Sequence, residues 1–245
     1  MNKYVIGNWK MNGSWEENSL LLNLLKNNIN KSSKVKTVVC VPYPYLVQAK
    51  GLLLNSNISY GAQDLSTYNN GAYTGEVSAG MLADLGCKYV IVGHSERRIY
   101  FKESNELVAN KTKIALQNNL TPIVCIGETL EQRQSNQTFN ILEIQLKAIL
   151  DELTNDQIPN IILAYEPIWA IGTGQSATKE QAQEVHNYLR KICLEYNKIS
   201  PSILYGGSLK ANNAQEIFAM QDIDGGLIGG ASLIANEFLA ISNSL

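Results

Sequence analysis

The chain has 245 residues, of which 45% are hydrophobic and 17% charged, and its formal net charge is −2. A chain of this size and composition can bury a sizeable core and is typical of a soluble globular protein with one or two domains. The slightly acidic balance offers no basic footprint, so we expect neither a nucleic-acid partner nor attachment to a membrane through a basic patch.

Signals for targeting and for metal binding are weak. The apolar run at the start is too brief for the core of a signal peptide, and no stretch approaches the roughly 18 apolar residues of a membrane span. The cysteines lie far apart with no C-x-x-C pair; they are Cys40, Cys87, Cys125 and Cys193. We therefore expect reduced core thiols, no metal site and a cytoplasmic location.

Eight short runs rich in β-branched and apolar residues follow one another along the chain, and we predict a strand at each. In order they are Tyr4–Ile6, Thr37–Val41, Ile58–Tyr60, Tyr89–Val92, Pro122–Ile126, Ile161–Tyr165, Ile203–Tyr205 and Leu227–Ile228. Several are almost continuously apolar rather than alternating, which is typical of parallel strands covered by helices.

The segments between these runs carry helix patterns. Ser14 with Glu17 matches a capping box ahead of a leucine-rich stretch. Thr178 with Gln181 repeats the device before apolar residues at three- and four-residue spacing. A further amphipathic helix is predicted over residues 141–153.

Strands that alternate with helices indicate βαβ units, and eight such units in about 250 residues match the size of a closed (β/α)8 TIM barrel. No linker rich in Pro, Gly or Ser divides the chain, so we predict an α/β fold in which residues 1–245 form a single (β/α)8 barrel domain. The alternative is an open, doubly wound sheet of about six strands, which applies if residues 203–205 and 227–228 are not strands.

In a barrel the polar residues that follow the strands would lie together, because the carboxyl ends of parallel strands gather on one face. The residues concerned are Asn8, Lys10, Gln63, Asp64, His94, Glu96, Glu128, Glu166, Ser208, Gly229 and Gly230. A lysine, a histidine and a carboxylate together suit proton transfer at carbon, and glycines with a serine suit an anion. The predicted substrate is a small phosphorylated carbonyl compound. Position alone does not separate Glu128 from Glu166 as the reacting carboxylate.

The stretch AYEPIWAIGTGQ, at residues 164–175, shows how one strand ends at this face. Pro167 cannot donate a ladder hydrogen bond, so the chain must leave the sheet at Glu166. Residues 172–177 also fit the G-x-G-x-x-A fingerprint of dinucleotide-binding proteins. That fingerprint needs its first glycine directly after the strand, whereas six residues separate Tyr165 from Gly172, so we reject a dinucleotide cofactor.

Five motifs together resemble the signatures of the triosephosphate isomerase family. They are GNWKMNG at 7–13, GHSERR at 93–98, YEPIWAIGTG at 165–174, YGGS at 205–208 and GGASL at 229–233. They occur in the family's order and span nearly the whole chain. The resemblance implies interconversion of dihydroxyacetone phosphate and D-glyceraldehyde 3-phosphate by proton transfer through an enediolate, with no cofactor and no metal.

The same resemblance implies a role for each site residue. Glu166 matches the base that moves a proton between two carbons of the triose. His94 matches a neutral imidazole that shuttles a proton between the two substrate oxygens, and this family is a standard example of such pKa tuning. Lys10 matches the cation that holds the substrate. Residues 167–177 match a loop that closes over the substrate and excludes water. The implied substrate-binding residues are Asn8, Lys10, Gly172, Ser208, Gly229 and Gly230.

Other residues of the motifs are expected to act indirectly. Glu96 and Arg97 are expected to be polar partners of the reacting groups, and Trp9 is expected to pack beside the site. The second histidine, His186, lies in a predicted helix beside Val185 and Asn187, and we expect it to be solvated and inert.

The segment from Asp64 to Glu76 is too long for an ordinary connection, and a long loop inside a compact domain is usually functional. In the family this loop reaches into the neighbouring subunit, with the residue equivalent to Thr74 at its tip. The resemblance therefore implies a homodimer.

Three segments depart from the family's usual residues. Gly226 stands where relatives more often have a large aromatic residue, and Gln175–Ser176 stand where lysine and threonine are common. Ile234–Asn236 replace the usual lysine and proline. None of these changes removes a reacting group. Two alternative functions are a catalytically silent phosphate-binding barrel and a barrel isomerase for a larger sugar phosphate or an amine-bearing substrate. The short lid disfavours the second.

Overall fold

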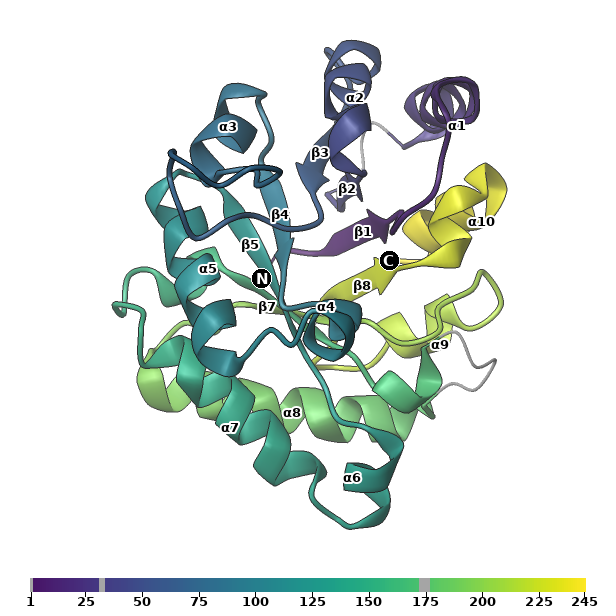
Figure 1. The fold of residues 1–245 in the computed structure, drawn as a ribbon. Coiled ribbons are helices and arrows are strands. Elements are labelled where there is room, and N and C mark those ends of the chain that lie inside the picture. The colour runs from purple at the N-terminus through teal and green to yellow at the C-terminus, as the bar shows by residue number, and fades with distance from the viewer. Residues whose placement is uncertain (1, 31–33, 172–176) are drawn as a thin grey trace.

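The fold is a closed barrel of eight parallel strands, described by a computed structural model that covers residues 2–30, 34–171 and 177–245 (Figure 1). In chain order the strands are β1 (Tyr4–Asn8), β2 (Lys36–Cys40), β3 (Ile58–Ala62), β4 (Tyr89–Val92), β5 (Thr121–Ile126), β6 (Ile162–Tyr165), β7 (Ser202–Tyr205) and β8 (Gly225–Ile228). Each strand pairs with the next, and β8 pairs with β1 to close the ring. The predicted (β/α)8 barrel is confirmed, and the open sheet is excluded.

Helices follow the strands and form a layer outside the ring. The described α-helices are α1 (Trp15–Asn28), α2 (Leu46–Leu52), α3 (Ala79–Asp84), α4 (Ser95–Tyr100), α5 (Asn105–Gln117), α6 (Leu130–Gln134), α7 (Thr138–Leu150), α8 (Lys179–Tyr196), α9 (Ala214–Phe218) and α10 (Ala235–Asn243). The described 3-10 helices are η1 (Tyr43–Tyr45), η2 (Ile158–Asn160), η3 (Ile168–Ala170) and η4 (Gly230–Leu233). None of the described helices combines the length and the apolar character that crossing a membrane requires.

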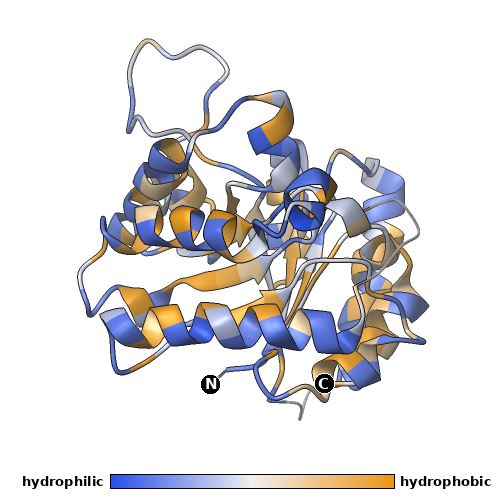
Figure 2. Ribbon diagram, turned by 90° about the horizontal axis from the view of Figure 1, so that it is seen from below, coloured by the Kyte–Doolittle hydropathy of each residue, from blue (hydrophilic) through white to orange (hydrophobic). Residues whose placement is uncertain are grey.

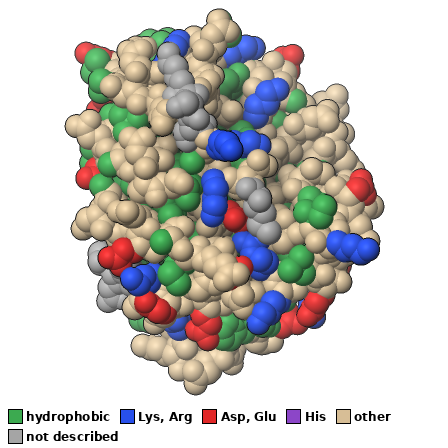
Figure 3. Space-filling view, turned by 180° about the vertical axis from the view of Figure 1, so that it is seen from behind, with side chains coloured by type: hydrophobic (Ala, Val, Ile, Leu, Met, Phe, Trp, Pro, Cys, Tyr) green, Lys and Arg blue, Asp and Glu red, His purple; other side chains and the backbone are tan. Residues whose placement is uncertain are grey.

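The hydropathy of the elements follows this arrangement. In Figure 2 the strands are largely orange, whereas the helices outside them mix blue and orange residues. Strands covered on both faces are expected to be apolar, and helices with one face on a core are expected to be amphipathic. The outer surface in Figure 3 carries basic, acidic and apolar side chains on the same face of the molecule.

Alternate strand positions build two apolar layers. Ile6 and Val38 belong to a layer that fills the inside of the ring. Their neighbours Val5 and Val39 belong to a larger layer between the strands and the helices. This alternation follows from strand geometry, because successive side chains point to opposite faces. All four cysteines are free and buried in these layers, as the sequence predicts.

Capping residues in the sequence mark the starts of two helices correctly. Ser14 accepts a hydrogen bond from the Glu17 amide at the start of α1, and Thr178 and Gln181 form a reciprocal capping box at the start of α8. The helix predicted over residues 141–153 is α7, which begins at Thr138 and ends at Leu150. Periodicity alone therefore places both the start and the end of this helix three residues too late, because the apolar pattern continues into a turn that is no longer helical.

The last strand begins two residues earlier than predicted, because two glycines extend it at its start. β8 begins at Gly225 rather than at Leu227. The φ angle of Gly225 is +136°, and a Cβ at this position would lie 1.8 Å from the Tyr4 carbonyl oxygen, so the approach of β8 to β1 requires glycine. At Gly226 the side chains of Leu209 and Phe218 fill the space that a larger residue would take.

The expectation that His186 is solvated is wrong. Its side chain is fully buried on α8, and Nδ1 lies 3.3 Å from the Asp222 carbonyl oxygen. Burial is the main cause that lowers the pKa of this imidazole, to about 3. His186 follows the buried Ala182 by four residues and therefore shares its helix face, so helical periodicity predicts burial where the neighbouring Asn187 suggests solvent.

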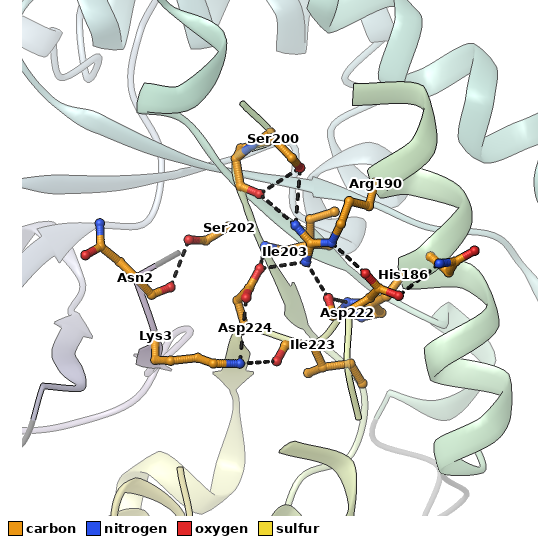
Figure 4. A network of polar contacts seen from close by, with 12 residues as sticks. Asn2, Lys3, His186, Arg190, Ser200, Ser202, Ile203, Asp222, Ile223 and Asp224 are labelled. Carbon is orange, nitrogen blue, oxygen red and sulfur yellow. Dashed lines mark hydrogen bonds and ion pairs between the residues drawn. The ribbon is translucent and has the colours of Figure 1, made fainter. Parts of the chain in front are cut away.

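A buried ionic network next to this histidine ties α8 to the closing strand (Figure 4). Nε of Arg190 lies 2.8 Å from Oδ1 of Asp222, and Nη2 lies 2.8 Å from Oδ2 of Asp224. Asp224 also accepts the amide of Ile203 at 3.0 Å and lies 3.7 Å from the Lys3 ammonium. The guanidinium therefore bridges two carboxylates that have little access to water.

Replacing Arg190 with methionine is expected to lower the free energy of unfolding by about 3–5 kcal/mol, because two buried carboxylates lose their cation. Urea unfolding followed by circular dichroism measures this change. Lys191→Met, at the exposed next position of the same helix, is the matched control and should change the free energy by less than about 0.5 kcal/mol. An equal decrease in the free energy of unfolding in the two variants would contradict the proposed contribution of the network to stability.

Candidate active site

The carboxyl ends of the strands surround a cavity of about 350 Å³ on one face of the barrel. Its lining contains every described residue to which the resemblance gave a catalytic or substrate-binding role, namely Asn8, Lys10, His94, Glu166, Ser208, Gly229 and Gly230. It does not contain the other polar residues predicted at this face, which are Gln63, Asp64, Glu96 and Glu128. Gly172, the remaining predicted binding residue, lies outside the described residues. The volume is near the lower end of the range for small-molecule sites and suits a small substrate.

Glu166 follows β6 and is only 2% exposed. Its Oε1 lies 2.9 Å from Nε2 of His94, and its Oε2 accepts the amide of Ser95 at 2.8 Å. Burial raises the pKa of this carboxyl, but His94, the Ser95 amide and Lys10 together lower it more, so the net direction is downward. The buried carboxylate is therefore held in its ionised form.

Two glycines make room for Glu166. A Cβ on Gly127 would lie 1.9 Å from the Glu166 carbonyl oxygen, and a Cβ on Gly206 would lie 3.0 Å from Glu166 Cγ. Gln145 holds Gly127 in place through two hydrogen bonds of 2.9 Å, one to its amide and one to its carbonyl. The position of the Glu166 carboxylate therefore depends on the two glycines, which have no side chain, as well as on Gln145.

His94 caps the start of α4 through its ring. Its Nδ1 accepts the amide of Glu96 at 3.2 Å, which leaves the proton of a neutral imidazole on Nε2, facing Glu166. Burial lowers the pKa of His94, but the Glu166 carboxylate, with a smaller contribution from Glu96, raises it more, so the net direction is upward while Glu166 stays in this position. The pKa of His94 therefore depends on where the Glu166 carboxylate lies.

Lys10 adopts a backbone conformation that is uncommon for a residue with a side chain. Its φ angle is +53°, and its amide donates to Oδ1 of the buried Asn8 at 3.0 Å. Its ammonium lies 2.6 Å from Oε1 of Glu96. Strained residues of this kind persist where the surroundings determine them, and they gather at functional sites. Here the turn aims a lysine from β1 back over the cavity.

Glu128 and Glu166 were both candidates for the reacting carboxylate by position in the sequence, and the structure gives them different surroundings. Glu128 is fully buried and does not line the cavity. Its Oε1 accepts hydrogen bonds from Tyr165 at 3.1 Å and Trp169 at 2.9 Å, and it lies 3.1 Å from Nη1 of Arg133. Glu128 therefore anchors η3, the segment directly after Pro167, rather than facing a ligand.

The remaining motif residues divide in a similar way. Glu96 contacts Lys10, whereas Arg97 forms ion pairs with Asp64 at 2.8 Å and Glu103 at 2.7 Å. Arg97 therefore holds the base of the loop that begins at Asp64. Trp9 is fully buried and borders the cavity, as expected for a packing residue.

Ser208, Gly229 and Gly230 also line the cavity, and Gly229 lies beside the Lys10 side chain. Gly230 begins η4, and the first amides of a helix have no partner within the helix, so they suit an anion. Asn213 fixes the segment around Ser208: its side chain donates to the Ser208 carbonyl at 3.1 Å and accepts the Lys210 amide at 2.9 Å.

Sequence reasoning missed several residues of the cavity lining. They include Asn12, Gly206, Gly207, Leu209, Lys210 and Leu227. Asn12, Gly206 and Gly207 lie inside the motifs but received no role, and Leu209 and Lys210 directly follow the YGGS motif, so position in or beside a motif is the signal that could have found them. Among the described residues, no group of three or more His, Cys, Asp or Glu side chains is placed to hold a metal ion.

The fold and the cavity define a class: a (β/α)8-barrel protein in which a carboxylate, an imidazole and an ammonium converge beside an anion-suited end. Comparison with known proteins gives the family. The family model described as triosephosphate isomerase matches residues 3–245. Proteins named triosephosphate isomerase from Herminiimonas arsenicoxydans, Nitrosomonas europaea and Cupriavidus necator are 54%, 52% and 51% identical to the chain. These matches cover 98%, 97% and 99% of this chain and 97%, 96% and 99% of the relatives. The chain belongs to the triosephosphate isomerase family.

Replacing Glu166 with glutamine is expected to lower the pKa of His94, because the carboxylate that raises it is removed while burial remains. NMR titration of the imidazole Cε1–H signals measures the shift. The chain has only two histidines, and His186, with a pKa of about 3, should stay neutral above pH 5 and serve as the internal reference. An unchanged or raised His94 pKa in the variant would contradict the coupling.

Proposed function

We propose that Glu166, His94 and Lys10 carry out the family's reaction in the cavity described above. Members of the family interconvert dihydroxyacetone phosphate and D-glyceraldehyde 3-phosphate through an enediolate, without a cofactor, and this isomerisation is the activity of the protein. The observation that supports the residue roles is the 2.9 Å contact between the Glu166 carboxylate and Nε2 of His94, on the wall of a cavity that Lys10 also lines.

In this proposal the Glu166 carboxylate takes a proton from one carbon of the triose and returns it to the next carbon. A base must come within about 3 Å of the proton donor, and both oxygens of Glu166 are engaged by His94 and by the Ser95 amide. Substrate must therefore draw the carboxylate out of these two contacts. Its lowered pKa keeps it ionised and ready to accept a proton at neutral pH.

His94 donates from Nε2 to the carbonyl oxygen on which negative charge develops. Once Glu166 turns to the substrate, the carboxylate that raises the His94 pKa leaves Nε2, whereas burial and the Glu96 amide at Nδ1 remain. Both of these favour the neutral imidazole. A neutral imidazole with a fixed tautomer can give a proton to one oxygen and recover it from the adjacent one.

Lys10 and the backbone at Ser208, Gly229 and Gly230 hold the anionic ester. The Lys10 ammonium offsets charge on the enediolate, and Asn8 supports the turn that carries it. We assign phosphate binding to Ser208, Gly229 and Gly230, with Gly172 as a further donor on the loop predicted to close over the site. That loop assignment follows from the family motif.

Glu166→Asp is expected to lower kcat by about 10²-fold with little change in KM, because the shorter side chain misplaces the base by about 1 Å. A coupled assay of triose phosphate isomerisation without added metal or nucleotide measures both constants. Glu131→Asp, the same substitution at an exposed position on α6, is the control and should leave both constants unchanged.

The same assay distinguishes an isomerase from the main alternative, a barrel that binds phosphate without catalysis. An unsubstituted protein that binds inorganic phosphate but does not isomerise either triose phosphate would favour a catalytically silent phosphate-binding barrel. A variant in which Glu166→Asp leaves kcat unchanged would instead contradict the role of Glu166 as the base.

We also infer that the protein is a homodimer. A second cavity, of about 610 Å³, adjoins the active site and is bordered by Lys10 and His94 on one side. Its outer wall contains Met11, Tyr100 and Phe101, whose side chains are 95%, 74% and 66% exposed. Large apolar side chains gathered around one cavity are typical of an interaction surface.

The loop from Asp64 to Glu76 is suited to fill this cavity on a second copy of the chain. Tyr68 and Tyr73 stack within it, with ring centroids 3.8 Å apart and planes 8° from parallel. Its base is fixed, because the Asp64 carboxylate lies 2.6 Å from the Lys111 ammonium. A loop with internal order loses less conformational entropy on docking. With Thr74 at its tip, the docked loop would also support the partner's reacting residues.

Phe101→Glu is expected to shift the protein toward the monomer and to lower its specific activity, because a charge would be buried in the apolar interface. Sedimentation velocity and the coupled assay measure the two effects. Leu54→Glu, at a residue 65% exposed outside the cavity, is the matched control and should leave the mass unchanged. A stable and fully active monomer of the unsubstituted chain would contradict the dimer.

A cytoplasmic location is part of the same proposal. All four cysteines are free and buried, with no disulfide among them. Unpaired cysteines of this kind suit a reducing compartment.

A further inference from the structure

A lysine outside the family motifs lines the active-site cavity. Lys210 lies two residues after Ser208, on the segment between β7 and α9, and its side chain is exposed. The segment is held in place, because the Asn213 side chain accepts the Lys210 amide at 2.9 Å and donates to the Ser208 carbonyl at 3.1 Å. An ammonium on a flexible stem is thus attached to a fixed backbone at the phosphate end of the site.

Few positive charges around the cavity are available to balance a substrate with two negative charges. The ionisable residues of its described lining are Lys10, His94, Glu166 and Lys210. The Lys10 ammonium already lies 2.6 Å from the Glu96 carboxylate, and Glu166 is held ionised. The net charge of the whole chain is −2, so the molecule as a whole does not attract an anion. Within the described residues, Lys210 forms no ion pair that would neutralise it.

We propose that Lys210 is a positioning residue that draws the phosphate dianion of the substrate to the cavity mouth and orients it toward Ser208, Gly229 and Gly230. This role rests on the proposed function of the cavity. It differs from that of Lys10, whose stem lies beside Gly229 and whose ammonium is tied to Glu96. Lys210 acts before the chemical step, and Lys10 acts during it.

The expected size of the effect follows from Coulomb's law. One positive charge and a dianion about 7 Å apart in a water-exposed site interact strongly enough to change binding about three- to tenfold. Salt screens exposed charges over about 10 Å at 0.1 M ionic strength, so the effect should shrink as salt is added. Because Lys210 lines the phosphate end, kcat/KM should change and kcat should not.

The experiment compares the unsubstituted protein with Lys210→Gln, Lys210→Arg and Lys50→Gln in the coupled assay with D-glyceraldehyde 3-phosphate at several ionic strengths. Lys210→Gln should lower kcat/KM about three- to tenfold at low salt, raise the inhibition constant of inorganic phosphate by a similar factor and leave kcat nearly unchanged. The difference from the unsubstituted protein should fade at high salt. Lys210→Arg should restore kcat/KM, because it keeps the charge.

Lys50→Gln removes an exposed lysine from α2 that does not line the cavity, so it controls for the loss of one positive charge. Circular dichroism should show that all variants keep the fold. The proposal is overturned if Lys210→Gln matches Lys50→Gln in kcat/KM and in salt dependence, or if kcat falls while KM is unchanged. Failure of the unsubstituted protein to isomerise would instead remove the proposed function itself, and this inference with it.

Discussion

The contact between β8 and β1 closes the ring, and the arrangement of the cavity depends on it. The Tyr4 amide donates to the Asp224 carbonyl at 3.0 Å, and the next residue, Gly225, approaches Tyr4 so closely that no Cβ would fit. Arg190 on α8 neutralises Asp224 at the same place. Closure brings the end of β8 beside the end of β1, so that a Cβ on Gly229 would lie 3.4 Å from Lys10 Cε. The cation from the first strand and the anion-suited glycines of the last strand therefore share one cavity.

Three carboxylates near this face have different surroundings, and these surroundings separate their roles. Glu128 is fully buried among a phenol, an indole and a guanidinium, so its oxygen is occupied by structural donors. Glu96 is partly exposed and pairs with Lys10. Glu166 is buried like Glu128 but faces the cavity, and its partner is an imidazole that can itself exchange a proton. The chemistry of each group follows from its partners rather than from its residue type.

The pairing of Glu166 with His94 describes the site before substrate is bound. In this arrangement the pKa of the carboxyl is lowered and the pKa of the imidazole is raised, and each shift has the other group among its causes. Moving the carboxylate toward a substrate carbon would relax both shifts together. The base would then become easier to protonate as the imidazole becomes easier to keep neutral, which suits a reaction that passes one proton between neighbouring atoms.

The local sequence determined the eight strands, the alternation with helices and the residues that follow each strand, because apolar runs, caps and Pro167 act over a few residues. The five motifs determined the family for the same reason. The family motif pointed to Glu166 rather than Glu128 as the reacting carboxylate. Tertiary structure decided what surrounds each of the two carboxylates, and that β8 begins at Gly225. It also placed Lys210 on the cavity wall. These outcomes depend on groups that are distant in the chain and meet only when the ring closes, so no local pattern records them. His186 is the exception, since its helix spacing already predicted burial and only its polar neighbour suggested otherwise.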